Sequence, residues 1–474
     1  MTMKILLKIV LWIILAAVIT VAVSWIAVVI FRDDIFAFVE TTINNRITTK
    51  TRVGTYSFSV LKRFPRASVK LSDVTLLSSS GFDKSQFANY NADTLLYAGS
   101  VTLEFRLTDL LKGIYRIENA SVSDGKLYLL TDSTGGINYQ ISTGSGKNTG
   151  SGSFDLNRIV LRNINTLYLN RSTSLGISGT IDNAKLRSVI KGSVIDFICS
   201  AGLSLNRFEL YKTRINAGAD VSLDINMQSS DTSVIFRKGT LKLEGYSFDL
   251  SGFIHPGRDI LLKITGKNID LGGARKYIPA IYGDRIRNYQ AGGVLNAEYV
   301  LYGPLDRTKN LFADANFSVK RGSLSVRNPE IKIRNLELSG SYTNGSKAGP
   351  STSRLLVDKC SFNIGNALWS ASLSAHDFTD AKVSLTFAGD LYPAELISYL
   401  NIPGLISADG LIRLNTSISG RVFKNGRINP GTIVSSVKAA DIRFESFSLK
   451  HTDDRFNISN VSGNIMAAEN LWAD

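Results

Sequence analysis

Residues 221–225 read Val-Ser-Leu-Asp-Ile, so apolar and polar side chains alternate strictly. Residues 260–264 (Ile-Leu-Leu-Lys-Ile) place apolar residues at the same spacing. Because successive side chains of a strand point to opposite faces, this period of two predicts strands with one apolar and one wet face. That alternation is typical of antiparallel sheets rather than of buried parallel ones. The same pattern recurs at Val69/Leu71, Val101/Leu103/Phe105, Leu203/Leu205, Leu241/Leu243, Ile331/Ile333 and Ile442/Phe444.

The sequence therefore predicts a mainly β protein with an elongated, curled antiparallel sheet, an open groove and a few short helices. The helices are expected at residues 106–112, 271–282 and 392–400. The last two are each followed by an Ile-Pro pair and then by a strand bracketed by glycines ten residues apart, at Gly293/Gly303 and Gly410/Gly420. This recurrence after 117 residues predicts an internal repeat.

Composition narrows the class of protein. Of the 474 residues, 44% are hydrophobic and 20% are charged, which excludes a disordered tail and a polytopic membrane bundle. The formal net charge of +14 favours an anionic partner. The basic residues are scattered along predicted strands, without a basic helix or a stacked-aromatic RNA-binding motif. We therefore expect no nucleic-acid partner, and two interpretations stay open: the charges lie scattered on the wet face, or they attract anionic lipid head groups at either end of the molecule.

An N-terminal segment is the strongest single signal in the chain. From Ile9 to Phe31, 23 residues carry no charge, and at ~1.5 Å per residue they span about 34 Å, enough to cross a bilayer. Two lysines precede the segment, so the positive-inside rule places the N-terminus in the cytoplasm and the remainder outside it. A cleavable signal peptide is the alternative, because residues 22–24 are small. The length of the apolar run favours an uncleaved anchor.

These features divide the chain into three parts. Residues 1–32 form a cytoplasmic tip and a transmembrane anchor, residues 33–153 a first unit, and residues 154–474 a repetitive β-groove body. Within the first unit, residues 35–50 carry apolar side chains at three- and four-residue spacing. That spacing predicts a short amphipathic helix near the membrane surface.

Signals of catalysis are scarce. The chain has three histidines and two cysteines, Cys199 and Cys360, with no CxxC or zinc spacing. We expect both cysteines to behave as small buried apolar residues. The Gly/Ser-rich loop at 144–153 lacks the residues of a phosphate-binding loop, and no GxSxG or HExxH motif occurs. We predict no enzyme activity, cofactor or metal. One alternative stays open, a catalytic pair of carboxylates that are distant in sequence, for instance Asp453 with another acidic residue.

A succession of motifs follows the predicted anchor. It runs through Arg63–Arg66, a strand into Leu71–Thr75, Leu107–Gly113, Ile117–Val122 and finally Asp132–Tyr139. This order resembles the N-terminal region of the AsmA-like family of bacterial envelope proteins, sharply over about the first 170 residues. The positions that carry the resemblance are Phe64, Pro65, Leu110, Leu111, Gly113, Gly135, Asn138 and Tyr139.

The resemblance implies a single-pass inner-membrane protein with a periplasmic β-groove, related to bridge-like lipid-transfer proteins. It implies phospholipid transport between membranes and a role in outer-membrane biogenesis. The implied partners are phospholipids, the inner membrane and outer-membrane or periplasmic envelope proteins. It supplies no catalytic residues. Family members usually run several hundred residues longer, so we expect this chain to be an N-terminal fragment.

The dimensions and energetics of the predicted groove also suit an acyl ligand. A sheet of ~20–25 strands at ~4.8 Å spacing would be about 95–120 Å long, and acyl chains along its apolar face would gain ~0.8 kcal/mol per buried CH₂. Two alternatives stay open, an envelope scaffold that assists outer-membrane protein assembly and a closed sandwich core. Which face of each strand lines the groove is also open. The candidate groove residues are Val69, Leu71, Val101, Leu103, Phe105, Leu127 and Leu129.

Overall fold

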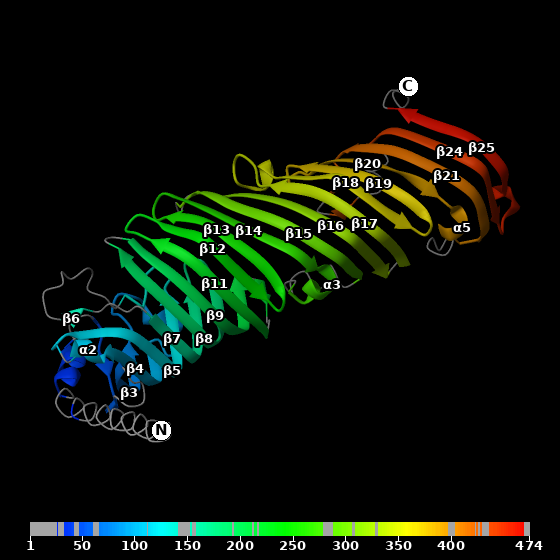
Figure 1. Cartoon of the computed structure of the whole chain (residues 1–474). Helices are drawn as coiled ribbons and strands as arrows, with labels where there is room; N and C mark the ends of the chain where they lie inside the picture. The colour runs from blue at the N-terminus through cyan, green and yellow to red at the C-terminus, as the bar shows by residue number, and fades with distance from the viewer. Residues whose placement is uncertain are drawn as a thin grey trace, which may run out of the picture. The chain divides into compact units, whose positions relative to one another are not determined.

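The computed structural model shows a mainly β protein: strands hold 71% of the described residues, and the helices among those residues are few and short (Figure 1). This confirms the predicted fold class in its coarser form, a curled, open and largely antiparallel sheet. The structure describes residues 26, 33–41, 47–59, 66–110, 112–140, 152–153, 158–191, 194–210, 213–215, 218–277, 288–305, 309–327, 330–396, 403–421, 423–424, 427–428 and 436–468.

The chain divides into two compact units. The first comprises Met1–Ser230 with Lys242–Glu244, and the second comprises Asp231–Leu241 with Gly245–Asp474. Strand β12 (Val234–Leu243) contributes residues to both units.

In the first unit the long strands pair in the order β2–β3–β4–β5–β7–β8–β9–β11. The segment boundary predicted at residue 153 falls inside this unit. The strands are β1 (Thr51–Arg52), β2 (Thr55–Ser59), β3 (Arg66–Leu77), β4 (Thr94–Arg106), β5 (Tyr115–Thr131), β6 (Gly152–Ser153), β7 (Arg158–Asn170), β8 (Leu175–Lys191), β9 (Val194–Leu210), β10 (Thr213–Ile215) and β11 (Ala219–Ser229). The helices with assigned bounds are η2 (Lys84–Phe87) and α2 (Leu107–Leu110).

One pair of long strands in this unit departs from the predicted antiparallel arrangement. Strands β5 and β7 run parallel, with Val122 opposite Leu161. A parallel pair needs a connection of a dozen or more residues, whereas a two-residue turn can join an antiparallel pair. Residues 132–157 separate the two strands and include the Gly/Ser-rich loop at 144–153. The side-chain alternation predicted antiparallel pairing here because it indicates a sheet with one wet face, and the β5–β7 pair keeps such a face although it is parallel.

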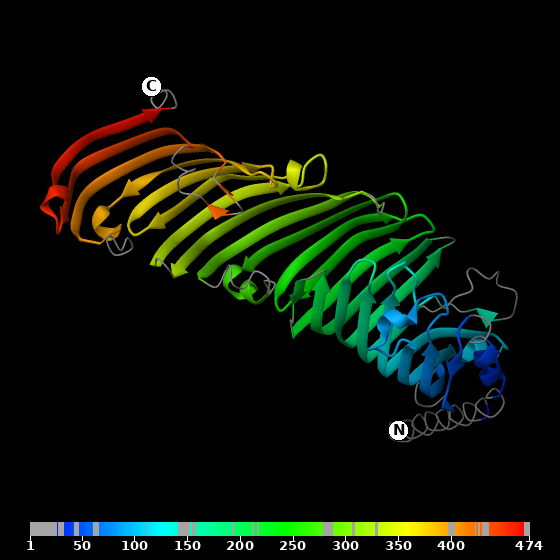
Figure 2. The ribbon, with the colours of Figure 1, turned by 180° about the vertical axis from the view of Figure 1, so that it is seen from behind.

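In the second unit every long strand pairs antiparallel with the next, from β13 to β21 and then β24 and β25. Figure 1 and the reverse view in Figure 2 show these strands side by side in chain order. The strands are β13 (Tyr246–His255), β14 (Asp259–Asp270), β15 (Tyr289–Pro304), β16 (Phe312–Arg327), β17 (Glu330–Thr343), β18 (Arg354–Ile364), β19 (Ala367–His376), β20 (Lys382–Leu391), β21 (Leu405–Gly420), β24 (Val437–His451) and β25 (Ile458–Ala468). A separate hairpin joins β22 (Phe423–Lys424) and β23 (Arg427–Ile428), and the helices are α3 (Leu271–Ala274), η3 (Arg275–Tyr277), η5 (Pro350–Thr352), α5 (Pro393–Leu396) and η6 (Asp454–Phe456).

Residues with left-handed backbone interrupt neighbouring ladders in both units. In the first, Asp73, Asp124 and Asn163 have φ of 53°, 58° and 51°, and Asn163 Nδ2 donates to Asp124 Oδ1 at 2.8 Å. In the second, Asn268 and Arg321 have φ of 55° and 50° and lie at register shifts of β14 and β16. Asn and Asp tolerate this conformation because their short side chains bond locally. At the register shifts of β14 and β16 the ladders carry β-bulges, which bend and twist a strand locally.

The two strands predicted as repeat copies are β15 and β21, which have 16 residues each. Helix α3 precedes the first and α5, which begins at Pro393, precedes the second. Gly293 and Gly410 lie at register shifts of their strands and have φ of 114° and 98°. The predicted copies therefore share a glycine bulge near the start of the strand, whereas the second glycine differs: Gly303 has a φ of 130° and Gly420 has no positive φ.

Several predictions fall on residues outside those described. The anchor at 9–31 does so except for Ile26, and among the described residues no helix is long and apolar enough to cross a membrane. Phe64, Pro65 and Leu111 also lie outside the described residues.

Candidate functional site

The strands of the first unit align their apolar side chains into unbroken rows. Cα partners on neighbouring strands share a face of the sheet, so the registers define each row. The Leu71 row runs from β3 to β11 through Leu71, Val101, Val122, Leu161, Ala184, Ala201 and Leu223. The Cys199 row lies beside it on the same face, from β2 to β11, through Phe58, Val69, Leu103, Ala120, Ile159, Leu186, Cys199 and Ile225. Neither row contains a charged side chain.

The two ends of these rows differ in exposure. At β3 and β4 the side chains are buried except for the partly exposed Val101, with Val69 at 0% and Leu103 at 8%. At β7, β8 and β11, Ile159, Leu186 and Ile225 are only half-buried. The apolar face is thus packed at its first strands and partly accessible over the later ones.

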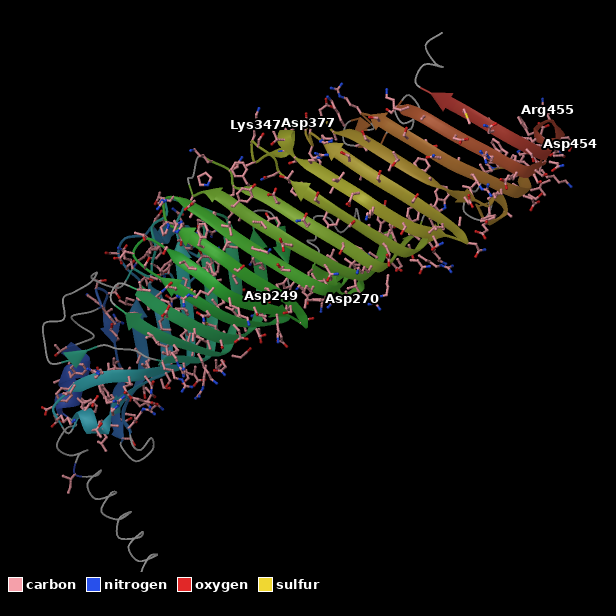
Figure 3. All side chains as sticks on the ribbon, turned by 45° about the horizontal axis from the view of Figure 1, so that its top comes forward. Asp249, Asp270, Lys347, Asp377, Asp454 and Arg455 are labelled. Atoms are coloured by element: carbon pink, nitrogen blue, oxygen red, sulfur yellow. The ribbon has the colours of Figure 1, made fainter. Side chains whose placement is uncertain are left out.

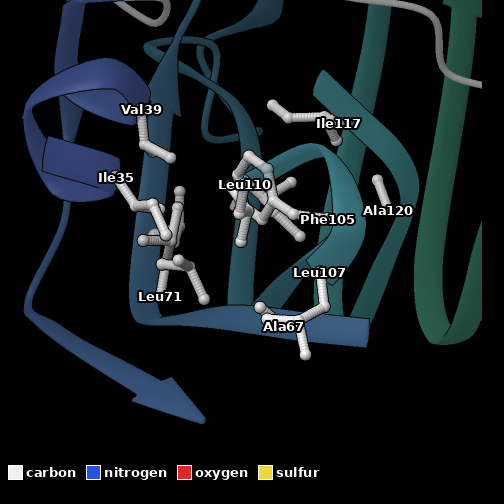
Figure 4. Packing of buried hydrophobic residues seen from close by; sticks show 12 residues of the cluster. Ile35, Val39, Ala67, Leu71, Phe105, Leu107, Leu110, Ile117 and Ala120 are labelled. Atoms are coloured by element: carbon white, nitrogen blue, oxygen red, sulfur yellow. The ribbon is translucent and has the colours of Figure 1, made fainter. Parts of the chain in front are cut away.

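The helix at residues 33–41 covers the packed end (Figure 4). Its Ile35 and Val39 are 0% and 1% exposed and pack in one cluster with residues of β3, β4, α2 and β5. The Phe38 ring stacks on Tyr115 with centroids 5.6 Å apart. The described helix spans residues 33–41 of the predicted 35–50, and its apolar residues Ile35 and Val39 pack on the sheet; its position near the membrane surface stays a prediction.

Because the helix at residues 33–41 covers the first strands, four of the predicted groove residues do not line an accessible groove. Val69, Leu71, Leu103 and Phe105 are buried in the cluster beneath the helix, so they form a packed core and not an accessible lining. Val101 packs against that cluster and is partly exposed. The prediction identified the apolar face of these strands correctly but not the strands on which it is accessible.

Leu127 and Leu129, the other two predicted groove residues, are half-buried in β5. Leu127 lies opposite Leu96 on one side and Thr166 on the other. The sequence analysis missed the accessible residues of the later strands, although the same alternation marks them. Those residues are Ile159, Leu161, Leu186, Leu223 and Ile225.

The second unit carries a longer apolar row. The Phe248 row crosses ten strands through Phe248, Gly266, Ala297, Phe317, Gly340, Val357, Leu373, Leu385, Ile418 and Val437. Most of these side chains are half-buried. At a strand spacing of about 4.8 Å the row is roughly 43 Å long. One leaflet of a ~30 Å hydrocarbon core is roughly 15 Å thick, so the row exceeds the depth of one leaflet.

The two free cysteines lie among these apolar residues, one in each unit. Cys199 is the Cα partner of Leu186 and Ile225, and Cys360 is the partner of Leu338 and Ala371. Both are half-buried, and burial raises the pKa of each thiol. They are therefore partly accessible apolar residues, whereas the sequence predicted buried ones.

Polar side chains occupy the opposite face. In the second unit, successive partners Asp249, Thr265, Glu298 and Asn316 alternate with the Phe248 row, and Asp249 is labelled in Figure 3. Lys263 Nζ lies 2.7 Å from Glu298 Oε2 with both side chains well exposed. Exposed ion pairs of this kind contribute little to the stability of the fold. This face is therefore a solvent-exposed polar surface, and its ion pairs are not a main source of stability.

The motif positions after β5 have a structural role. Asp132 Oδ1 accepts from Thr134 N at 2.9 Å and Gly136 N at 2.8 Å, and Oδ2 accepts from Asp83 N at 2.9 Å. These bonds from backbone N–H groups, the Asp83 bond foremost, and a bond from the Thr134 hydroxyl hold the pKa of the Asp132 carboxyl at about 2. The carboxylate thus joins the turn after β5 to the loop before η2.

The neighbouring motif asparagine completes this connection. Asn138 is fully buried; its Oδ1 accepts from Leu130 N at 2.8 Å, and its Nδ2 donates to Tyr128 O at 2.9 Å. Of the other positions, Leu110 is buried in the cluster under the helix, while Gly113 and Gly135 have φ of 70° and 94°. Tyr139 Oη lies 3.5 Å from Thr131 Oγ1.

Among the described residues no group of three His, Cys, Asp or Glu side chains is placed to hold a metal ion. The comparisons with known proteins found no matching family model, no matching curated protein and no matching solved structure. The candidate functional site is the accessible part of the apolar rows in each unit.

Proposed function

We propose that this chain is an inner-membrane-anchored periplasmic protein that holds phospholipid acyl chains along its apolar rows and moves phospholipid between membranes during outer-membrane biogenesis. The observation that carries the proposal is the alignment of half-exposed apolar side chains across consecutive strands without an intervening charge. The anchor predicted at residues 9–31 and the resemblance to the AsmA-like family add support from the sequence.

The energetics favour an acyl ligand over an empty face. Half-buried Leu, Ile and Phe side chains leave apolar area in water, and covering that area is worth ~25 cal/mol per Å². Burial of each CH₂ of an acyl chain on the strands is favourable by ~0.8 kcal/mol. Ten methylenes would therefore contribute about 8 kcal/mol to the free energy of binding, before the entropic cost of ordering the chain is subtracted. No chemical step is required of the protein.

The test is native mass spectrometry of the full chain released from a mild detergent, with extraction and identification of bound lipid. We expect several phospholipids per chain for the natural sequence. Ile225→Lys should reduce the lipid count because it places a charge in the Cys199 row, where Ile225 is the partner of Cys199. The matched control is Asn226→Lys, one residue along the same strand and on the polar face.

Circular dichroism and urea unfolding of both variants exclude loss of the fold as the cause. A folded natural chain that carries no lipid would overturn the proposal and favour an envelope scaffold that binds proteins instead. Equal lipid counts in the two lysine variants would show that the rows are not the binding surface.

A further inference from the structure

A hollow lined by arginines lies on the polar face of the first unit, on the other side of the sheet from the apolar rows. Its volume is about 820 Å³, within the range of pockets that hold small molecules. Its lining comes from β3, β4, β5, β7 and β8, all in the first unit. The described charged residues of the lining are Arg66, Arg158, Arg162, Arg187 and Glu104.

The registers concentrate positive charge at this point. Arg158 of β7 and Arg187 of β8 are direct Cα partners, which brings their Cβ atoms to about 4.5–5.5 Å. Arg162 lies four residues along β7 on the same face, and Val160 between them is 9% exposed. Like charges directly opposite each other destabilise a sheet, so this pair has an electrostatic cost.

The acidic residues nearby are already engaged. Glu118 pairs with Arg66 at 3.3 Å and with Arg106, and Glu104 accepts from Asn119 Nδ2 at 2.9 Å. Within the part of the chain that the structure describes, the side chains of Arg158, Arg162 and Arg187 make no ion pair with a carboxylate. An excess of cationic side chains therefore faces an open volume.

We propose that this hollow binds a phosphate-bearing ligand with at least two negative charges. Guanidinium groups recognise phosphate oxygens through paired N–H donors, and several arginines around one volume match a phosphomonoester or a diphosphate. Val160 and Val189 supply apolar contact beside the charges. The arginines lie on the polar face, opposite the apolar rows, so their role stands whether or not those rows hold acyl chains.

The test is isothermal titration of the full chain at low salt with three probes: inorganic pyrophosphate, dihexanoyl phosphatidate and the zwitterionic dihexanoyl phosphatidylcholine. We expect binding of one or both anionic probes, weakened at least tenfold by Arg158→Gln with Arg187→Gln. The matched control is Lys126→Gln, which removes an exposed positive charge from β5 outside the lining. Tighter binding of phosphatidate indicates a lipid head group, and tighter binding of pyrophosphate indicates a soluble phosphate compound.

A second measurement separates a ligand site from a structural role. Without ligand, Arg158→Gln should unfold at the same or a higher urea concentration than the natural chain, because it removes a like-charge pair. With the bound probe, the natural chain should gain stability and the variant should not. Absence of binding to both anionic probes, or equal weakening by Lys126→Gln, overturns the proposal.

Discussion

At the scale of single residues, Asp132 shows how a motif position works through hydrogen bonds. Its folded pKa of about 2 lies below the ordinary value near 3.9 because backbone N–H groups and the Thr134 hydroxyl donate to it. A depressed folded pKa contributes stability that is present above the unfolded pKa and lost as the pH falls through the folded one. The contribution should therefore be complete above about pH 4 and disappear towards pH 2.

We expect Asp132→Asn to lower the free energy of unfolding at pH 7, and the difference from the natural chain to shrink as the pH falls from 4 to 2. Urea titrations at several pH values measure it. Asp93→Asn is the control, because this aspartate is exposed and its pair with Lys84 lies on the surface. A difference that stays constant between pH 4 and pH 2 would contradict the assignment.

At the scale of elements, the helix at 33–41 acts as a cover for the first strands. Ile35→Ala removes a fully buried side chain from the cluster that it forms with β3 and β4. Substitutions of this kind cost about 2–5 kcal/mol, which urea unfolding of the first unit would measure. Glu40→Ala, on the exposed side of the same helix, should change stability by less than ~0.5 kcal/mol. Similar losses for both would mean that the helix does not pack as described.

A second element-scale prediction concerns the bulge in β15. Gly293 has a φ of 114°, and an added Cβ would lie 2.6 Å from Gly322 Cα. Gly293→Ala should therefore cost about 1–3 kcal/mol through backbone strain and a contact with the neighbouring strand. Gly349→Ala should be nearly neutral, because only Lys347 O lies near, at 3.7 Å. Chemical denaturation followed by circular dichroism distinguishes the two.

At the scale of the whole molecule, the sequence predicted the apolar and polar faces well because a period of two maps directly onto a pleated strand. The alternation of Val221, Leu223 and Ile225 reappears as one continuous face in the registers. It could not predict which strands are covered, because the packing of Ile35 into one cluster with Val69 depends on the path of the chain in space. The arginine hollow could not be predicted from the sequence for a similar reason, because Arg158 and Arg187 become partners only through the pairing of β7 with β8.

The same long-range pairing gives a prediction about the two units together. Cys199 lies in the apolar row of the first unit, and Cys360 lies one row away from the Phe248 row of the second. If lipid covers the apolar face of each unit, it should slow the maleimide labelling of both thiols. Peptide mass spectrometry measures the labelling of each cysteine separately. Burial already raises the pKa of both thiols, so labelling at pH 8 keeps the reaction measurable.

Because the rows belong to separate sets of strands, we expect the two sites to respond independently. Ile225→Lys should restore fast labelling of Cys199 and leave Cys360 protected, whereas Phe317→Lys should do the reverse. Asn226→Lys and Asn316→Lys, each one residue away on the polar face, should leave both thiols protected. Exposure of both cysteines by either apolar-row substitution, with the fold intact, would contradict this independence. Equal labelling with and without lipid in the natural chain would instead exclude these rows as the lipid site.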